Sequence, residues 1–507
     1  MTDNKVNAQC QALISLLGAD KVFLPDSADY KAQPSSYFTP QTAAVQPACF
    51  VAPQTAEEVA AVIKSLTSVP ADGGEPVPFA IRGGGHEWFA GANSEPNGVT
   101  IDLRGLHDIA LSEDKSRVTV GAGATWDAVY AQLDPLGLSV VGGQIAGVGV
   151  GGLTLGGGLS YFGPREGWAC NQVTQFAVVL ADGSQVVAGE EGENADLWWG
   201  LRGGSNNLGI VTSMTYRTFE QVELIWSTLA VHPITEKDKQ ARVFSRLMDA
   251  EQYDVNAYFL TGWNFLGERK MSVGTSQMVY TRPPGGDADG DGEVVIPAFY
   301  RPAWDDIAQI EPNMGIPPGV ATMSALAQRA VMYRPPRKSR YMSATTTFIP
   351  TEAMMRGAYD AFDASVEKVA NVKGVHWGMC MEPIPPALYD NQTHSGGGAQ
   401  TNALGLGTRT QKTLATFVLS PAWPDAADDE TVYDAARWLV AEVEKIAKEL
   451  GVYDPFLYLN YAAPWQEVIR SYGEESVKKL QELRQRVDPR LVFTHQVKGG
   501  FKIPPSE

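Results

Sequence analysis

Glycine is concentrated in one part of this chain, and this concentration constrains the fold more than any other feature. The sequence holds 51 glycines among 507 residues, about a tenth, where about 7% is usual. They gather between positions 83 and 209, in RGGGH, GGQIAGVGVGGLTLGGG and LRGGSNNLG. Because glycine lacks a Cβ, its backbone can approach another group closely. Each stretch alone could be a structural loop, but together they predict backbone N–H groups lying against a ligand.

Length and charge restrict the class of protein. A chain of 507 residues is too long for one small core, so we expect two joined domains. The net charge of −18, with no basic cluster, argues against a nucleic-acid partner. No signal peptide and no apolar run of membrane-spanning length are evident. We therefore expect a cytoplasmic protein with no membrane partner, although the sequon at Asn391 leaves secretion open. The cysteines lack metal-site spacing, and a Cys10–Cys49 disulfide is left open.

The hydrophobic pattern changes near residue 220. Residues 45–219 alternate short strands, helices and tight turns, which predicts an α+β region. Within it, Thr55 and Glu58 form a helix capping box, and Asp182-Gly183 marks a hairpin turn. Longer alternating segments downstream predict an antiparallel sheet with helices on one face. Near the C-terminus, FLYLNYA predicts a strand and EESVKKLQELRQRV a helix.

Two further motifs match known binding patterns incompletely. GVGVGG, at 147–152, has the spacing of a dinucleotide-binding turn, but no acidic residue follows at the required distance. GGDADGDGE, at 285–293, places Asp287, Asp289 and Asp291 as in a calcium loop, but Ala298 stands where the bidentate glutamate belongs. We therefore predict neither a Rossmann domain nor a metal site.

The order of the glycine motifs identifies a family. RGGGH, GVTIDL, VGVGGLTLGGG and LRGGSNNLGIVT follow one another, and the C-terminal YLNYAAPWQEVIRSYGEESVKKLQELRQRVDPRLVF and GGFK continue the pattern. Over nearly its whole length the chain resembles the FAD-linked oxidases of the vanillyl-alcohol oxidase superfamily, in the berberine bridge enzyme-like group. The resemblance implies an α+β fold. Its two-part FAD-binding domain (1–219, with its core at 45–219, and 455–507) would surround a substrate domain at 220–454, an antiparallel sheet flanked by helices.

The resemblance also implies how the cofactor is held. His86 stands where relatives bind FAD covalently through the 8α-methyl group of the flavin. Many relatives add a second link through a cysteine, but Ile145 occupies that position here, so one link is implied. Val148 stands where relatives control oxygen access, and a valine there resembles the oxidases. The implied cofactor-binding residues are Arg82, Gly83, Gly84, Gly85, His86, Val148, Gly149, Gly151, Gly152, Gly156, Gly157, Gly158, Asn207, Gly209, Ile210, Val211 and Asn460.

The catalytic base is less clearly indicated. Oxidation by hydride transfer also needs a group that takes a proton from the substrate. Relatives use a glutamate, or a tyrosine made acidic by its neighbours. Val418 aligns with the glutamate position, so a tyrosine is favoured: Tyr458 first, then Tyr461 and Tyr161.

Strand alternation gives these tyrosines an expected orientation. Tyr458 and Asn460 would share one face of a strand, and Tyr461 would point the other way unless the strand ends there. Tyr458 could equally be a half-buried core residue. His376 and Glu382, on the substrate sheet, are weaker candidates for substrate contact.

We therefore expect an FAD-dependent oxidoreductase that oxidises a small alcohol, amine, sugar or secondary metabolite. Hydride would pass to flavin N5, and O2 would reoxidise the flavin and form H2O2. Because no carboxylate occupies the Val418 strand, a flavin-bearing cyclase or isomerase is an alternative. A flavin fold used only as a binding module is a third. The expected partners are the small-molecule substrate and O2, and the oligomeric state is open.

Overall fold

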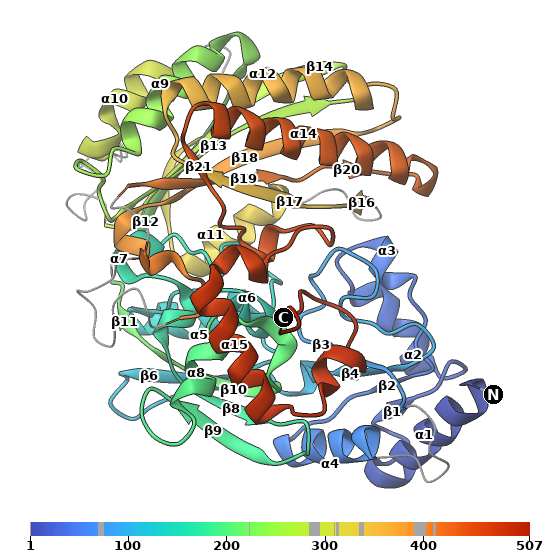
Figure 1. The fold of residues 1–507 in the computed structure, drawn as a ribbon. Coiled ribbons are helices and arrows are strands. Elements are labelled where there is room, and N and C mark those ends of the chain that lie inside the picture. The colour runs from blue at the N-terminus through green and yellow to red at the C-terminus, as the bar shows by residue number, and fades with distance from the viewer. Residues whose placement is uncertain are drawn as a thin grey trace.

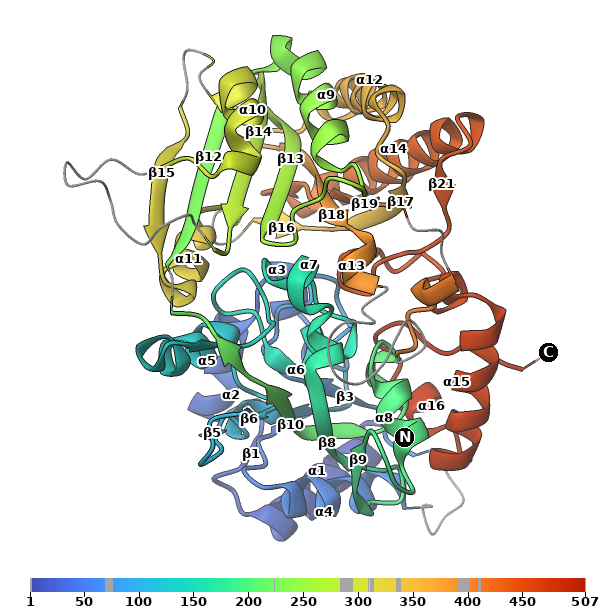
Figure 2. The same ribbon diagram turned by 90° about the vertical axis from the view of Figure 1, so that its left-hand side faces the viewer.

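The computed structural model describes residues 2–68, 76–222, 224–282, 295–308, 310, 314–333, 339–389, 402–408 and 412–506. The acidic motif at 285–293 and the sequon at Asn391 lie outside these residues. The chain forms a lower and an upper half in the view of Figure 1, and the C-terminal segment returns to the lower half (Figures 1 and 2). No helix in the described ranges has the length and apolar character to cross a membrane.

The lower half is built on two main sheets. The first has the order β1-β2-β4-β3, with β2 and β3 parallel to β4, and the second has the antiparallel order β5-β6-β10-β8-β9. Their strands are β1 (Val22–Phe23), β2 (Cys49–Val51), β3 (Phe79–Arg82), β4 (Val99–Asp102), β5 (Ile109–Leu111), β6 (Arg117–Gly121), β8 (Val173–Val179), β9 (Gln185–Gly189) and β10 (Ile210–Arg217). A small pair, β7 (Leu138–Ser139) and β11 (Phe219–Glu220), lies beside them.

Local signals in this half are confirmed. Helix α4 (Ala56–Thr67) begins after Thr55, whose side chain accepts the backbone N–H of Glu58 at 3.2 Å. Gly183, with φ +77, makes the turn between antiparallel β8 and β9. Helices α5 (Trp126–Leu133) and α8 (Ala195–Leu201) lie among the short strands of this half, as expected of an α+β region.

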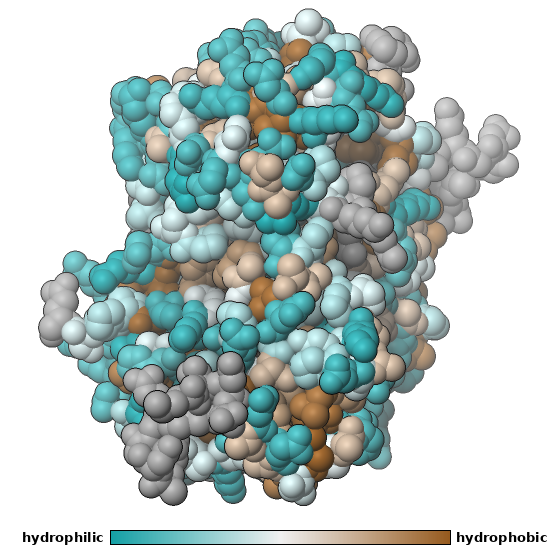
Figure 3. Space-filling model, turned by 90° about the vertical axis from the view of Figure 1, so that its right-hand side faces the viewer, coloured by the Kyte–Doolittle hydropathy of each residue, from teal (hydrophilic) through white to brown (hydrophobic). Residues whose placement is uncertain are grey.

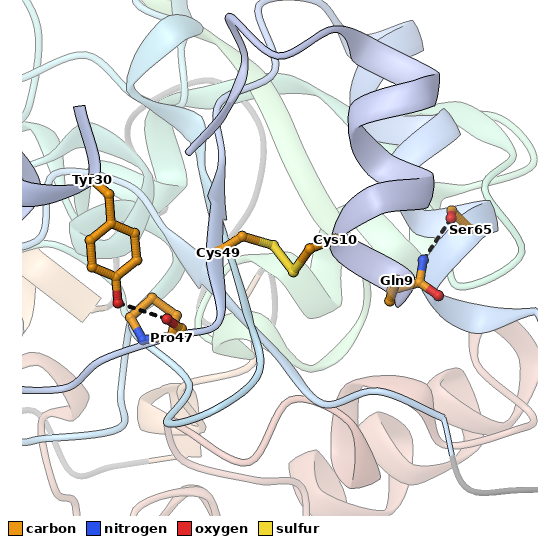
Figure 4. Close-up of a disulfide and its surroundings, with 6 residues drawn as sticks. All are labelled: Gln9, Cys10, Tyr30, Pro47, Cys49 and Ser65. Atoms are coloured by element: carbon orange, nitrogen blue, oxygen red, sulfur yellow. Dashed lines mark hydrogen bonds between the residues drawn. A yellow bond between two sulfur atoms is a disulfide. The ribbon is translucent and has the colours of Figure 1, made fainter. Parts of the chain in front are cut away.

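A disulfide ties the N-terminal helix to the first sheet. Cys10 of α1 (Thr2–Leu17) is bonded to Cys49 of β2, with Cα atoms 6.3 Å apart (Figure 4). Beside it, Gln9 donates to the Ser65 hydroxyl of α4 at 2.7 Å. The bridge therefore fixes α1 to β2, and the Gln9–Ser65 contact joins α1 to α4. The bridge also answers the question of cysteine pairing that the sequence left open.

The described residues of the upper half form one antiparallel sheet of ten strands, and the antiparallel sheet itself was predicted. Its main order is β15-β12-β14-β13-β18-β19-β17-β21, and β16 and β20 pair beside it. Helices α9, α12 and α14 cover the face turned away from the lower half (Figure 1). The bounds are β12 (Ile225–Pro233), α9 (Lys237–Leu247), β13 (Ala257–Leu266), β14 (Met271–Tyr280), β15 (Ile316–Ala321), β16 (Arg340–Tyr341), β17 (Ala344–Phe348), α12 (Glu352–Val369), β18 (His376–Ile384), β19 (Leu414–Leu419), β20 (Ala422–Trp423), α14 (Asp429–Glu449) and β21 (Tyr453–Asp454).

The C-terminal segment contradicts one prediction. FLYLNYA forms no strand. Its described backbone is irregular and then makes a 3-10 turn over Leu459–Tyr461. Helix α15 (Glu474–Val487) follows as predicted and packs on α8 of the lower half. Figure 3 shows one face of the molecule, on which hydrophobic residues are interspersed among hydrophilic ones.

Candidate active site and cofactor cradle

Two glycine loops cross next to His86. Residues 83–85 carry the chain from the end of β3 to His86, and Gly84 meets Gly149 of the second glycine segment. A Cβ on Gly84 would lie 2.7 Å from Gly149 Cα, and a Cβ on Gly149 would lie 2.7 Å from Gly84 N. Gly85 has a φ of +68, which an L side chain rarely adopts. The crossing itself therefore requires these glycines, and it places His86 beside the second loop.

The second glycine segment leaves bare backbone beside the crossing. It enters the short helix α6 (Val150–Leu155), where a Cβ on Gly152 would meet nothing within 4 Å. A Cβ on Gly151, in contrast, would lie only 2.9 Å from the Ala122 carbonyl oxygen. A Cβ on Gly156 would collide with the Asn460 amide, whose Nδ2 donates to the Leu153 carbonyl at 2.9 Å. Gly152 is exposed on this segment, so its backbone is open to a flat ligand such as the expected flavin.

Gly157 and Gly158 complete this segment with φ values of +110 and +88. Val148, half-buried in the loop before α6, accepts the Trp126 N–H through its carbonyl at 3.1 Å. Val148, Gly157 and Gly158 are among the residues for which the sequence predicts a contact with FAD, and that contact stays a prediction.

Two predicted cofactor residues use their side chains within the protein. The buried Arg82 guanidinium lies 3.4 Å from an Asp102 carboxylate oxygen and 3.8 Å from the centre of the Tyr37 ring. Asn207 donates to the Phe501 carbonyl at 2.8 Å and so holds the C-terminal segment. A contact of either residue with FAD would therefore use its backbone. The neighbouring candidates lie at the start of β10 and are buried there: Gly209, Ile210 and Val211.

The Tyr458 hydroxyl is buried and hydrogen-bonded within the protein. Its hydroxyl accepts the Leu159 N–H and the Asn460 Nδ2–H, each at 2.9 Å. Burial raises the pKa of Tyr458 above its ordinary value, so the phenolate is disfavoured. Tyr458 fixes Asn460 and the end of the glycine segment, and its geometry suits a base poorly.

Tyr461 contacts a carboxylate instead. Its hydroxyl donates to Glu382 Oε1 at 2.9 Å, and the Tyr258 hydroxyl donates to Glu382 Oε2 at 2.6 Å. Glu382 is only 4% exposed, and this burial raises its pKa. Burial and the neighbouring carboxylate raise the pKa of Tyr461 as well. In this group Glu382 is therefore the more favourable final proton acceptor, with Tyr461 as a neutral phenol next to it.

The strand that would point Tyr461 away from Tyr458 does not form. Because residues 459–461 form a 3-10 turn, the rings of Tyr458 and Tyr461 meet edge to face, 4.8 Å apart. Asn460 bonds to Tyr458, so Tyr461, Tyr458 and Asn460 connect the Glu382 carboxylate to the glycine segment.

The carboxylate expected at Val418 of β19 is found on the neighbouring strand, β18. Val418 of β19 is opposite Cys380 of β18, and Thr416 is opposite Glu382. The carboxylate therefore comes from the neighbouring strand, where Glu382 was named only as a weaker substrate contact. One signal was available: Glu382 is the only charged residue in the strand segment WGMCMEPI.

Of the two remaining candidates, Tyr161 lies next to the Glu382 group and His376 does not. The Tyr161 ring packs edge to face on Tyr258 at 5.4 Å, and its hydroxyl accepts from Gln277 Nε2 at 3.2 Å. His376 lies at the opposite end of β18 from Glu382, with its Nε2 3.0 Å from Asn264 Oδ1. Tyr161 thus belongs to the Glu382 group, and His376 does not.

Sequence reasoning missed two residues beside His86. Phe38 stacks on the imidazole, with ring centroids 4.1 Å apart and planes at 14°. Burial raises the pKa of the Glu87 carboxyl to about 7. Phe38 lies 48 positions before His86 and outside every glycine motif, so no local signal could have paired them.

Comparison with known proteins identifies the family. An FAD binding domain family matches residues 47–189. The chain is 31% identical to the FAD-dependent monooxygenase drtC of Aspergillus calidoustus, over 97% of this chain and 90% of that protein. It is 36% identical to the protein named oligopeptidase PhomG' of Diaporthe leptostromiformis, where 97% of this chain spans only 37% of the longer relative.

Solved structures share the fold at low sequence identity. The xylooligosaccharide oxidase of Myceliophthora thermophila aligns over 99% of both chains, with a TM-score of 0.74 and 19% identity. Berberine bridge enzyme aligns over 98% of this chain and 100% of its own, with a TM-score of 0.72 and 15% identity. The sequence relatives show that the chain belongs to the family of FAD-dependent oxidoreductases that includes drtC, and the solved structures show that it has the fold of berberine bridge enzyme.

Proposed function

We propose that this protein carries FAD covalently at His86 and oxidises a small organic substrate, with Glu382 and Tyr461 as the proton-accepting pair. The observation that carries the proposal is the buried Glu382 carboxylate, bonded to two phenols and connected to the glycine cradle through Tyr461, Tyr458 and Asn460. When bound, FAD accepts a hydride at N5 and returns the electrons to O2, which forms H2O2.

The pair acts as a short proton relay. A substrate O–H or N–H that donates to the Tyr461 oxygen can lose its proton as the phenolic proton moves to Glu382 Oε1, 2.9 Å away. Tyr258 holds the second carboxylate oxygen and so fixes the orientation of the carboxylate. The raised pKa makes Glu382 a stronger base than an exposed carboxylate. Glu382 thus supplies a carboxylate at the site. The absence of one was the reason for keeping a cyclase or isomerase as the alternative.

Covalent attachment rests on the position of His86. The glucooligosaccharide oxidase of Acremonium strictum, 18% identical with a TM-score of 0.73, carries a 6-S-cysteinyl, 8α-N1-histidyl FAD. In this chain Ile145 stands where the resemblance puts the cysteine, so we propose a histidyl link alone. Val148 beside the cradle supports reoxidation by O2. The substrate class is an alcohol, amine, sugar or secondary metabolite.

A substrate panel tests the proposal. Anaerobic bleaching of the flavin should identify a substrate, and turnover in air should release H2O2. Flavin should remain with acid-precipitated wild type and be absent from precipitated His86→Ala. Glu382→Gln should lower kcat by about 10²- to 10⁴-fold, and Tyr461→Phe should lower it similarly. Tyr280→Phe is the matched control, because its phenol donates to a different carboxylate, Asp254, and it should leave kcat unchanged. Because several relatives are named monooxygenases, ¹⁸O₂ should be supplied. Stoichiometric ¹⁸O in the product, with no H2O2, would contradict oxidase chemistry.

A further inference from the structure

The N-terminal segment 38–42 holds the loop around His86. The Phe38 ring stacks on the imidazole at 4.1 Å with an interplanar angle of 14°. The backbone N–H of Phe38 also donates to the Gly85 carbonyl at 3.0 Å. One residue therefore holds both the ring of His86 and the peptide that precedes it.

The two threonines that follow hold the peptides on the other side. Thr39 Oγ1 donates to the Trp88 carbonyl at 2.9 Å, and Thr42 Oγ1 donates to the Glu87 carbonyl at 3.2 Å. Thr39 is also the N-cap of helix α3 (Pro40–Ala43). The carbonyls of residues 85, 87 and 88 are thus all bonded to one short segment.

The upper half supports this segment from outside. Tyr341 of β16 packs edge to face on Phe38 with centroids 5.2 Å apart, and its carbonyl accepts a hydrogen bond from the Gln41 amide. The stacked pair therefore lies between the N-terminal segment and the second half of the protein. Rotation of the Phe38 ring away from His86 would therefore also break its packing on the Tyr341 ring.

We propose that Phe38 is a positioning residue for the attachment of FAD to His86. The inference rests on the proposed covalent link. In that reaction the imidazole N–H bond and one C–H bond of the 8α-methyl group break, and a C–N bond forms. The two electrons reduce the flavin, O2 reoxidises it, and the two protons leave in H2O2. The ring nitrogen must meet the methyl carbon at about 3–3.5 Å along one direction, and the stacked ring fixes that direction.

Reconstitution with FAD separates positioning from folding. Flavin-free wild type, Phe38→Leu, Phe38→Tyr and Phe89→Leu would each be mixed with FAD. In-gel fluorescence of denatured samples gives the rate of covalent attachment, and early quenching of flavin fluorescence gives the reversible Kd. Phe89 is the matched control because it is also half-buried, lies three residues after His86 and packs on Phe501 at 6.2 Å.

Phe38→Leu should slow attachment by about tenfold or more while leaving the reversible Kd nearly unchanged. Phe38→Tyr, which keeps the ring, should restore the rate, and Phe89→Leu should match wild type. Attachment by Phe38→Leu at the wild-type rate would overturn the inference, as would equal slowing in Phe89→Leu. Absence of covalent flavin from wild type would instead refute the proposed link at His86.

Discussion

Alanine substitutions in the two glycine segments test the cradle directly. In Gly84→Ala the new Cβ would lie 2.7 Å from Gly149 Cα and 2.8 Å from its N. Since unstrained carbon contacts lie at about 3.5–4.0 Å, the two backbones must separate by about 1 Å. Overpacking of this kind costs about 1–3 kcal/mol, and backbone atoms cannot rotate away as a side chain could.

Gly152→Ala should behave in the opposite way in the flavin-free protein. Nothing lies within 4 Å of its added Cβ, and the residue is helical. Alanine is favoured over glycine in helices by up to about 1 kcal/mol. We therefore expect Gly84→Ala to lower the thermal midpoint of the flavin-free protein and Gly152→Ala to keep or raise it.

The order of effects should change when FAD is titrated. If the flavin covers Gly152, the added methyl group should weaken reversible binding in a His86→Ala background by about tenfold or more, the equivalent of about 1.4 kcal/mol. Isothermal titration against the His86→Ala parent measures this. Undiminished FAD affinity in Gly152→Ala would refute the placement of the cofactor over α6, and an undestabilised Gly84→Ala would refute the loop crossing.

Three further variants test other parts of the structure. Because only ionised Glu382 accepts a proton and burial raises its pKa, kcat/KM should increase with pH through a limb above the ordinary carboxyl range. This rise of kcat/KM with pH should vanish in Glu382→Gln. If it persists, the titrating group is a residue other than Glu382. Replacing Cys10 and Cys49 by serine opens a 39-residue loop, so unfolding should become easier by up to about 4 kcal/mol, and reduced wild type should show the same shift. Val148→Leu should slow reoxidation of bleached flavin in air but leave anaerobic bleaching unchanged; equal oxidation rates would remove Val148 from oxygen control.

The features predicted from sequence are those that depend on short-range chemistry. Thr55 caps α4 because a hydroxyl at that position satisfies a free N–H of the first turn. Gly183 turns the β8–β9 hairpin because it adopts a positive φ. The sheet-and-helix class of the upper half followed from alternating segments long enough to read without tertiary information.

The base was harder to predict because it depends on register and on one irregular turn. Strand alternation separates Tyr458 from Tyr461, but the 3-10 turn at 459–461 brings both rings to one side. Glu382 of β18 bonds to Tyr461, which lies 79 positions later in the chain. Neither contact leaves a local pattern in a single sequence.

The structure also explains why the fold alone does not identify the substrate. A xylooligosaccharide oxidase, 6-hydroxy-D-nicotine oxidase and berberine bridge enzyme share this fold at 15–19% identity, and a shared fold does not fix a substrate. The contacts predicted for the glycine loops and Asn460 are with groups common to any flavin. Leu260 and Gln277 instead face one another on β13 and β14, half-buried and on the same side of the sheet as Tyr258. Since Gln277 also bonds to Tyr161, substitutions at these two positions should change which substrate bleaches the flavin while leaving FAD attachment intact.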